Sequence, residues 1–189
     1  MEFISIEKLY ESRFITRYNL KYRTNAGNIK NYEIVSRSND IKTFEDLKNS
    51  PTDAVVLIIH DKEGQKILIN KEYRMAVGDY AYNFPAGLID PGEDYKTAAS
   101  RELWEETGLE LVDIKEVWPI SYSAVGITNE RSIVVIGTAK GEFAPSTSAE
   151  EEIEASWFTK EQMKELLKTD EHFAARTQAY CWCWANMEG

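Results

Sequence analysis

Three glutamates near the middle of the chain have a spacing that suits cation chemistry. The run Asp94–Thr107 favours a helix, and Gly108 follows where a C-terminal cap is expected. On such a helix Glu102, Glu105 and Glu106 occupy positions i, i+3 and i+4, so their carboxylates crowd one exposed face. Mutual repulsion leaves two arrangements, a face open to water or a face that binds a divalent cation. Carboxylate oxygens suit Mg²⁺ or Mn²⁺ rather than zinc.

Residues around this predicted helix would hold it beside a tight loop. Leu103 and Ala99, four positions apart, can pack the opposite face against a sheet. Gly87 and Gly92 permit a tight turn before the helix, close to the cation. Arg101 alone cannot neutralise three carboxylates. Taken without their surroundings, the glutamates favour a solvated acidic helix, so the wider spacing must decide.

The whole segment resembles the Nudix box. That pattern reads Gly, five residues, Glu, seven residues, Arg-Glu, an aliphatic residue, any residue, Glu-Glu, any residue, Gly and an aliphatic residue. The residues that match its specified positions are Gly87, Glu93, Arg101, Glu102, Leu103, Glu105, Glu106, Gly108 and Leu109. Seven positions demand one residue type each, and at roughly 7% usage a chance match is on the order of one in a million. The match therefore favours the cation site.

The resemblance implies a fold, a reaction and a metal site. Nudix hydrolases are α+β proteins with an α/β/α sandwich around a mixed sheet, and they cleave a diphosphate linked to another group. The implied cofactor is Mg²⁺, or Mn²⁺. The implied metal ligands are oxygen atoms of Ala86 (backbone carbonyl), Glu102, Glu105 and Glu106.

Two further box residues look like a brace. By resemblance, Glu93 and Arg101 form a pair that fixes the loop against the helix, and Glu105 assists the main metal carboxylates, Glu102 and Glu106, directly or through water. Glu93, Arg101 and Glu105 are therefore expected in the catalytic machinery.

Segments outside the box resemble those of ADP-ribose pyrophosphatases. Phe84–Asp90 is similar to the run that leads into the box in that subfamily. Similarity on two strands and one loop implies a set of substrate contacts: Tyr32, which would stack on adenine, Arg37, Arg74, Gly126 and Glu130. Taken singly, a strand tyrosine, a strand-end arginine and a loop glutamate are more often packing or surface residues.

The implied activity is Mg²⁺-dependent hydrolysis of ADP-ribose to AMP and ribose 5-phosphate. One departure bears on the substrate: the subfamily usually carries a proline just before the loop glycine, where this chain has Ala124-Val125. Other nucleotide sugars or small diphosphates therefore remain alternatives. A further alternative is a domain that senses nucleotides without cleaving them, although such regulators tend to lose box carboxylates that this chain keeps.

The attacking water needs a proton acceptor that is not occupied with cations. Ala144–Glu152 is a small, polar segment that ends in three acids, and a solvated turn is the plainer interpretation. In similar ADP-ribose pyrophosphatases this loop carries the catalytic glutamate. Alignment on the following strand places it at Glu151, with Glu150 or Glu152 if the register slips by one. Glu130, from the earlier loop, is the main alternative.

The elements that must position these residues are mostly strands. Phe14–Arg23 with Asn31–Arg37, and Ala54–His60 with Lys66–Asn70, read as hairpins around turn-rich segments. Further strands are expected at Tyr82–Gly87, Val117–Ser121, Ser132–Lys140 and Glu154–Phe158. Short helices are expected at Lys160–Leu167, with Thr159 and Gln162 as its capping box, and at His172–Met187.

The composition of the chain disfavours some classes of binding partner. The 189 residues include 22 Lys and Arg against 32 Asp and Glu, a net charge of −10, which disfavours binding to nucleic acid or anionic membranes. The longest apolar runs are strand-sized, too short to span a bilayer, and the N-terminus lacks the pattern of a signal peptide. Two cysteines, one residue apart, fit a reducing, cytoplasmic location.

We expect residues 1–50 to form a strand-rich N-terminal extension and residues 51–189 to form the Nudix domain. Similar proteins use such an extension to dimerise and to complete the partner's adenine pocket. A homodimer that takes a small nucleotide diphosphate is therefore expected.

Overall fold

The computed structural model describes residues 1–187, which divide into two compact units. Unit 1 comprises Met1–Ala54 together with Ile120–Ser132, and unit 2 comprises Val55–Pro119 and the chain from Ile133 onward. Ile120–Ser132 belongs to the same unit as the N-terminal residues, although it lies far away in the sequence. The expected boundary at residue 50 does not include this segment in the N-terminal unit.

Unit 1 contains an antiparallel sheet and a short helix. The predicted hairpin is confirmed: the two strands pair from Thr16↔Ser36 to Arg23↔Ile29 around a turn closed by Thr24. The helix was not expected, because its signal is one capping box at Thr43 and only five helical residues follow. The elements of the unit are β1 (Glu2–Glu11), β2 (Thr16–Arg23), β3 (Ile29–Ser36) and α1 (Phe44–Lys48).

Unit 2 is built on a sheet in which seven strands of the described chain take part, in the order β10-β5-β4-β9-β8, with β6 beside β5 and β7 beside β4. The second predicted hairpin, β4–β5, is confirmed by the pairing of His60 with Ile67. Tyr82–Gly87, expected as one strand, is divided between β6 and β7, because Pro85 has no N–H for a ladder. The strands are β4 (Ala54–His60), β5 (Lys66–Arg74), β6 (Asp79–Asn83), β7 (Ala86–Leu88), β8 (Glu110–Tyr122), β9 (Arg131–Lys140) and β10 (Ile153–Thr159).

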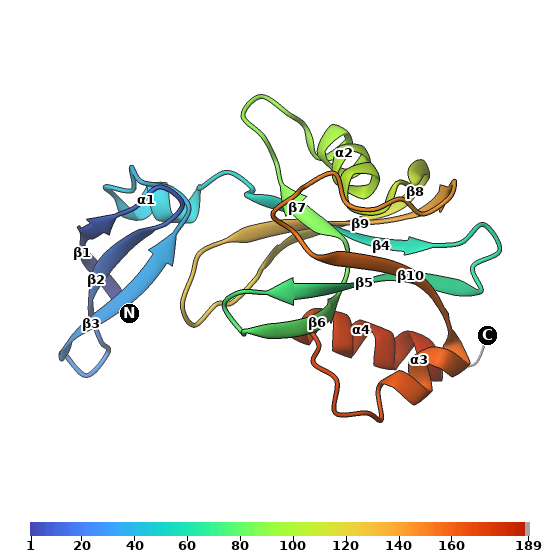
Figure 1. Cartoon of the computed structure of the whole chain (residues 1–189). Helices are drawn as coiled ribbons and strands as arrows, with labels where there is room; N and C mark the ends of the chain where they lie inside the picture. Colours follow the sequence, from blue (N-terminus) through green and yellow to red (C-terminus); the bar gives the residue numbers. More distant parts are fainter. Residues whose placement is uncertain (188–189) are drawn as a thin grey trace. The chain divides into compact units, whose positions relative to one another are not determined.

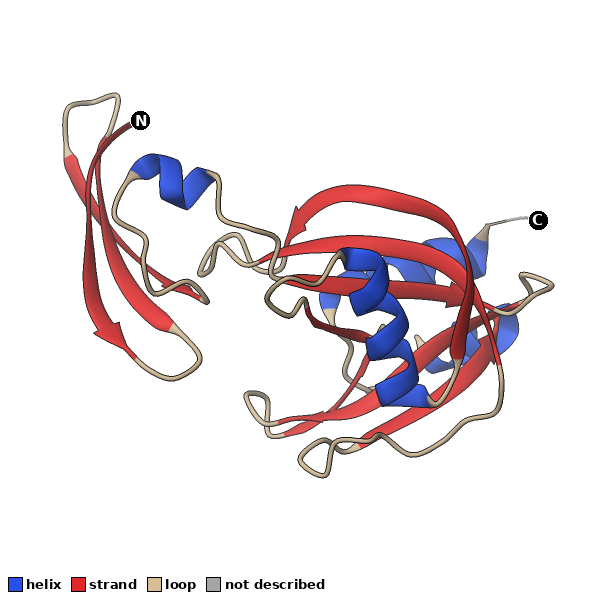
Figure 2. Ribbon diagram, turned by 90° about the horizontal axis from the view of Figure 1, so that it is seen from above, coloured by secondary structure: helices blue, strands red, loops and turns tan. Residues whose placement is uncertain are grey.

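Helices cover both faces of this sheet, α2 (Tyr95–Thr107) on one side and α3 (Lys160–Leu166) with α4 (Ala175–Asn186) on the other (Figures 1 and 2). The alternation of side chains along a strand explains both layers. Leu57 and Ile59 of β4 pack with Leu103 of α2, whereas Val56 and Ile58 pack in the cluster that α3 and α4 complete. The expected α+β fold, an α/β/α sandwich, is confirmed. No helix within residues 1–187 combines the length and apolar character needed to cross a bilayer.

The ends of α2 and α3 are set by the residues that the sequence indicates. Asp94 accepts hydrogen bonds from two backbone N–H groups at the start of α2, and Gly108 ends the helix with a left-handed φ of +76°. Thr159 and Gln162 form the predicted capping box of α3. Helix α4 begins at Ala175, later than the expected His172, and its N-cap residue Ala174 offers no side-chain acceptor.

Candidate active site

The three glutamates of α2 differ sharply in exposure. Glu106 is 7% exposed, the Glu102 side chain 13% and the Glu105 side chain 39%. The expectation that all three share one exposed face is wrong for Glu106. That side chain is covered because α2 packs against β7, and because Asn70 of β5 reaches its carboxylate.

Glu106 is a buried carboxylate with neutral hydrogen-bond donors. Its Oε2 accepts from Asn70 Nδ2 at 2.8 Å, and the backbone N–H of Ala86 also donates to it. Burial raises the pKa of Glu106 well above its ordinary value. The neighbouring carboxylates that raise this pKa further are Glu72, Glu102 and Glu151. Within the described residues no Lys or Arg forms an ion pair with Glu106, so this group lacks the positive charge that a buried carboxylate needs.

Gly87 permits the close approach of Glu102 to the backbone of β7. A Cβ atom at this position would overlap the Glu102 carboxylate. Burial raises the pKa of Glu102, although a hydrogen bond from Arg101 opposes the rise. The glycine at the start of the box thus leaves room for the carboxylate of a residue fifteen positions later, and a larger residue would displace that carboxylate.

Arg101 joins the loop before α2 to the helix. Its guanidinium makes a two-point pair with Glu93, at 3.0 Å and 2.8 Å, and donates to the Leu88 carbonyl at 2.9 Å. It also contacts Glu102 at 2.8 Å and Glu105 at 3.1 Å. The hydrogen bond from Arg101 lowers the pKa of Glu93. The two residues expected to brace the loop therefore touch, and Arg101 additionally supplies positive charge to two of the box carboxylates.

The loop expected to hold the base is tied to α2 at its start. The Ala144 N–H donates to the Thr107 carbonyl, and the Thr147 N–H donates to the Glu105 carbonyl, both at 2.9 Å. A Cβ at Gly108 would come within 2.6 Å of Ala144. Gly108 is therefore needed both for its left-handed backbone and for the passage of this loop.

The end of the same loop is anchored on β5 and β6. The Tyr73 N–H donates to the Glu152 carbonyl at 3.0 Å, and the Tyr80 hydroxyl donates to the Glu152 carboxylate. Glu151, the preceding residue, raises the pKa of both Glu102 and Glu106 through its negative charge. Glu151 is thus near enough for its charge to act on two box carboxylates, whereas the Glu152 carboxylate is hydrogen-bonded to Tyr80.

Four of the residues expected to contact the substrate lie in unit 1, where they form two contacting pairs. The Tyr32 hydroxyl donates to the Gly126 carbonyl at 2.6 Å, and Arg37 forms an ion pair with Glu130 at 2.6 Å. The fifth, Arg74, lies in unit 2 at the end of β5, with Nη1 3.4 Å from the Glu72 carboxylate. Glu130, the alternative base, therefore has its carboxylate engaged with an arginine.

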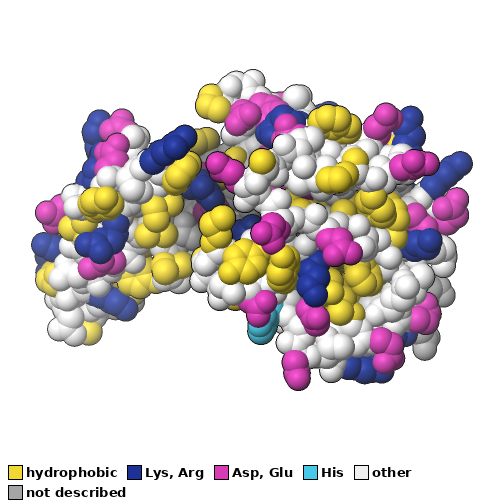
Figure 3. Space-filling model, in the orientation of Figure 1, with side chains coloured by type: hydrophobic (Ala, Val, Ile, Leu, Met, Phe, Trp, Pro, Cys, Tyr) yellow, Lys and Arg dark blue, Asp and Glu magenta, His cyan; other side chains and the backbone are white. Residues whose placement is uncertain are grey.

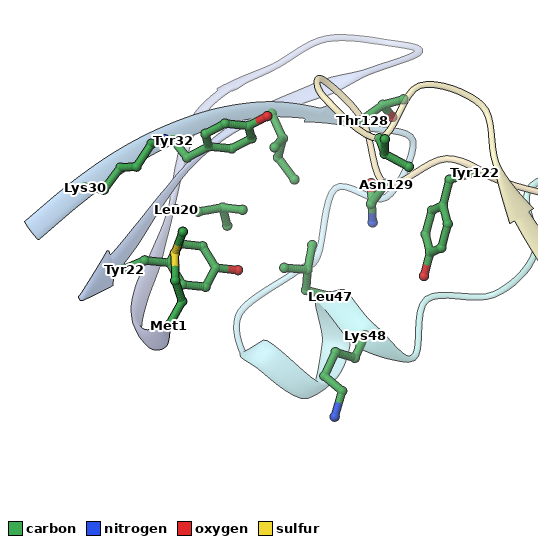
Figure 4. A pocket seen from close by; sticks show the side chains of 12 residues that line it. Met1, Leu20, Tyr22, Lys30, Tyr32, Leu47, Lys48, Tyr122, Thr128 and Asn129 are labelled. Carbon is green, nitrogen blue, oxygen red and sulfur yellow. The ribbon is translucent and has the colours of Figure 1, made fainter. Parts of the chain in front are cut away.

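Tyr32 also lines a cavity of about 490 Å³ in unit 1 (Figure 4). Aliphatic and aromatic side chains from β2, β3, α1 and the Ile120–Ser132 segment form most of its wall, and Lys30 and Lys48 stand at its edge. The lining residues include Leu20, Tyr22, Ile34, Leu47, Tyr122 and Val125. A flat apolar group with a negatively charged extension suits such a wall.

Two polar residues of β5 were missed as site residues. Asn70 contacts Glu106, and Glu72 is the first of the carboxylates that raise the pKa of Glu106. The alternation of side chains along the strand could have indicated both residues. Leu68 faces α2, and Asn70 and Glu72, two and four positions later, lie on the same side of the strand. Polar residues on the core-facing side of a strand carry a desolvation cost, which makes them candidates for a functional role.

The donor set fits a hard divalent cation. Carboxylates, an amide and a backbone segment converge where α2 packs on β7, and these groups offer the oxygen donors that Mg²⁺ and Mn²⁺ take. Within residues 1–187, however, no three acidic, cysteine or histidine side chains are arranged to hold a metal by themselves. Arg101 pairs with Glu102 and Glu105 instead. The metal-ligand roles of Ala86, Glu102, Glu105 and Glu106 stay predictions.

Comparison with known proteins agrees with this geometry. The family model described as NUDIX domain matches residues 50–181. The ADP-ribose pyrophosphatase of Saccharomyces cerevisiae is 40% identical over 43% of this chain and 36% of its own length. The ADP-sugar pyrophosphatase of Mus musculus is 26% identical over 74% of this chain and 62% of its own length.

A solved structure described as an ADP compounds hydrolase superimposes with a TM-score of 0.71 at 20% identity, covering 97% of this chain and 92% of that one. At this identity the likeness establishes the fold alone. The chain spans about half the length of the curated relatives it matches, from 28% to 62%.

Proposed function

This chain belongs to the Nudix family, and we propose that it hydrolyses ADP-linked diphosphates with the help of a divalent cation, with ADP-ribose as the preferred substrate. The products would be AMP and ribose 5-phosphate. The single observation that carries the proposal is the buried Glu106, surrounded by further carboxylates and held by neutral donors. Such a group is costly in a protein without a cation, so its burial is understandable as a device for binding one.

A divalent cation would supply charge that screens the diphosphate, polarises the phosphorus and makes water easier to deprotonate. Glu102 and Glu106 would hold it, with the Ala86 carbonyl and Glu105 as further donors. Arg101 and Glu93 would keep loop and helix in register, as their two-point contact suggests. Mg²⁺ is the proposed metal, with Mn²⁺ as the alternative.

Glu151 is the proposed proton acceptor. Its charge acts on Glu102 and Glu106, which supports a place near the box carboxylates. Its loop is tied to α2 by two backbone hydrogen bonds, which would keep the base close to the catalytic helix. A carboxylate within hydrogen-bond reach of water in the closed complex can take the proton during attack on phosphorus.

Tyr32 of unit 1 is the proposed platform for the adenine ring. Tyr32 offers a ring whose hydroxyl is already satisfied by the Gly126 carbonyl, so the ring orientation is fixed before a base stacks on it. The names of the yeast and mouse relatives support an ADP-linked substrate. Arg37, Arg74 and Glu130 remain proposed contacts for the rest of the molecule.

A panel of substrates tests the proposal. The purified chain with Mg²⁺ is incubated with ADP-ribose, another ADP-sugar, a UDP-sugar, a GDP-sugar and a 5′-triphosphorylated RNA, and the products are separated by anion-exchange chromatography. We expect AMP and ribose 5-phosphate from ADP-ribose as the fastest reaction. Faster hydrolysis of another nucleotide sugar would support a hydrolase with a different preferred substrate. Binding of a nucleotide without any product would favour a sensing domain.

The RNA substrate is the least favoured member of the panel. The chain carries a net charge of −10, and on the face drawn in Figure 3 the described Lys and Arg side chains are dispersed among acidic ones. Proteins that bind nucleic acid usually present a basic stripe. Cleavage of the RNA faster than ADP-ribose would therefore overturn the proposed substrate class.

A homodimer with a cytoplasmic location is also proposed, with the N-terminal strands at the interface. Several large apolar side chains of unit 1 are exposed, including Tyr10 and Phe14, which supports an interaction surface there. Light scattering after gel filtration measures the mass in solution. A monomeric mass at micromolar concentration would exclude the dimer.

A further inference from the structure

The face of β5 that meets α2 changes from apolar to polar along the strand. Leu68 packs in the core beneath α2, and Asn70 and Glu72 follow on the same side. Asn70 is 1% exposed and Glu72 8% exposed. Two buried polar side chains therefore stand beside Glu106, on a strand that lies outside the box.

Glu72 is held in place mainly by neutral groups. Asn83 Nδ2 donates to its Oε1 at 2.9 Å, the Thr177 hydroxyl donates to Asn83 Oδ1 at 3.0 Å, and the Phe84 N–H donates to the Thr177 oxygen at 3.2 Å. This chain of hydrogen bonds runs from α4 to the site. The ion-pair partner of Glu72, Arg74, lies 3.4 Å away on a side chain that is 57% exposed, so solvent weakens the pair.

Asn70 carries a second, independent sign of an absent partner. Its amide nitrogen donates to Glu106, but its Oδ1 is buried and accepts no hydrogen bond from any of the described residues. Buried side-chain acceptors are normally satisfied, so an orphaned oxygen in a site needs an explanation. An amide oxygen is a ligand that hard divalent cations accept, and this one belongs to a side chain that already contacts a box carboxylate.

We propose that Glu72 and the Oδ1 of Asn70, together with Glu106, bind a divalent cation on the β5 side of the site, beyond the ligands that the box supplies. The inference rests on the proposed function, because it assigns further residues to the same cation chemistry. The chain of Asn83 and Thr177 then serves to hold the Glu72 carboxylate toward the cation. A carboxylate rather than an amide at position 72 supplies a charged oxygen ligand, which a hard divalent cation prefers.

A purely structural role for Glu72 makes the opposite prediction. If Glu72 served only to complete the hydrogen bonds of Asn83, Glu72→Gln would leave metal binding unchanged, because Gln keeps an oxygen that accepts from Asn83. If Glu72 binds a cation, the same change removes repulsion with Glu106, keeps an oxygen that accepts from Asn83, and weakens metal binding.

Manganese titration without substrate separates the two roles. Free Mn²⁺ is measured by electron paramagnetic resonance with the parent chain and with Glu72→Gln, Asn70→Ala, Glu106→Gln and Glu154→Gln. We expect Glu72→Gln to weaken Mn²⁺ binding by about 10–100-fold and Asn70→Ala by about tenfold, the range for residues that orient or complete a metal site. Glu154→Gln, an exposed carboxylate on the neighbouring strand β10, is the matched control and should bind Mn²⁺ like the parent.

Melting temperatures in EDTA complete the test. The metal-free Glu72→Gln protein should melt at the same temperature as the parent or higher. Parent-like Mn²⁺ binding by Glu72→Gln would overturn the inference, and so would weaker binding accompanied by a lower melting temperature. Should Glu72→Gln not fold, Asn70→Ala with parent-like Mn²⁺ binding would overturn it equally.

The Glu106→Gln variant distinguishes this inference from the proposed function. Weak binding by Glu106→Gln with normal binding by Glu72→Gln would reject only the role of β5. Normal binding by both variants would reject the cation site itself.

Discussion

The carboxylate centre of unit 2 and the aromatic cavity of unit 1 differ in whether their charged groups have partners of opposite charge. In unit 2, Glu106 is buried beside other carboxylates and its pKa is raised by burial and by their charge. In unit 1, Glu130 is paired with Arg37, and the Tyr32 hydroxyl has an acceptor. The first region holds mutual repulsion that a cation can relieve, whereas in the second Glu130 and the Tyr32 hydroxyl already have partners. Changes in unit 2 should therefore alter turnover and metal dependence, and changes in unit 1 should alter substrate affinity.

Removing the buried charge should have the largest effect on activity. Glu106→Gln should lower kcat by about 10³-fold or more, because a cation at the diphosphate loses a charged ligand. Gln retains an oxygen that can accept from Asn70, so the fold should persist. Turnover at saturating Mg²⁺, with circular dichroism as the control for folding, measures this effect. Activity close to that of the parent would remove Glu106 from the site.

Loss of the proposed proton acceptor, Glu151, should have the second-largest effect on activity. Glu151→Gln should lower kcat by roughly 10²–10⁴-fold with little change in KM, because proton transfer is lost while binding groups remain. Glu130→Gln should lower kcat less, since the Glu130 carboxylate is engaged with Arg37. Steady-state kinetics of the two variants, measured side by side, give the ranking. If Glu130→Gln is the more damaging to kcat, the base lies on the earlier loop.

The platform in unit 1 should affect affinity. Tyr32→Ala should raise the KM for ADP-ribose by an amount equivalent to about 1–3 kcal/mol, as for other stacks of a base on an aromatic ring. Tyr32→Phe should be milder, because the ring face remains and only the hydrogen bond to Gly126 is lost. Initial rates over a range of ADP-ribose concentrations give KM. Equal KM values for Tyr32→Ala and the parent would mean that the ring only packs.

The smallest effect is a dependence of stability on pH. The pKa of Glu106 in the folded protein lies above its ordinary value of 4.5, so the folded state binds this proton more tightly than the unfolded chain does. The resulting stabilisation is fully present below the unfolded pKa and is lost as the pH rises through the folded pKa. Urea unfolding in EDTA should therefore show the parent losing stability relative to Glu106→Gln as the pH increases. Parallel curves for the two proteins would contradict a raised pKa.

Local chemistry explains which parts of the fold could be predicted. The caps at Asp94, Gly108 and Thr159 depend on groups within a few residues, and each is present as expected. The hairpins likewise follow from a turn between two alternating strands. The helix α1 was not predicted, because a single capping box is a weak signal. The sequence indicated that Pro85 would interrupt the strand, but not that a further strand, β7, would follow it.

The candidate site divides in the same manner. The types and spacing of Gly87, Glu93, Arg101, Glu102 and Glu106 were sufficient to indicate cation chemistry and the family. Their spacing could not indicate that Glu106 is buried, since exposure depends on which strands cover the helix.

The sequence by itself determined the box, the caps of its helix and the alternation that buries both faces of the sheet. Only the tertiary structure decided that Asn70 reaches Glu106 from 36 positions away, that Tyr32 meets Gly126 from 94 and that Arg37 meets Glu130 from 93. Helix capping and strand alternation act between near neighbours in the chain. Burial, charge repulsion and the pairing of distant side chains depend on how separate segments pack, and that is why they emerged only from the folded protein.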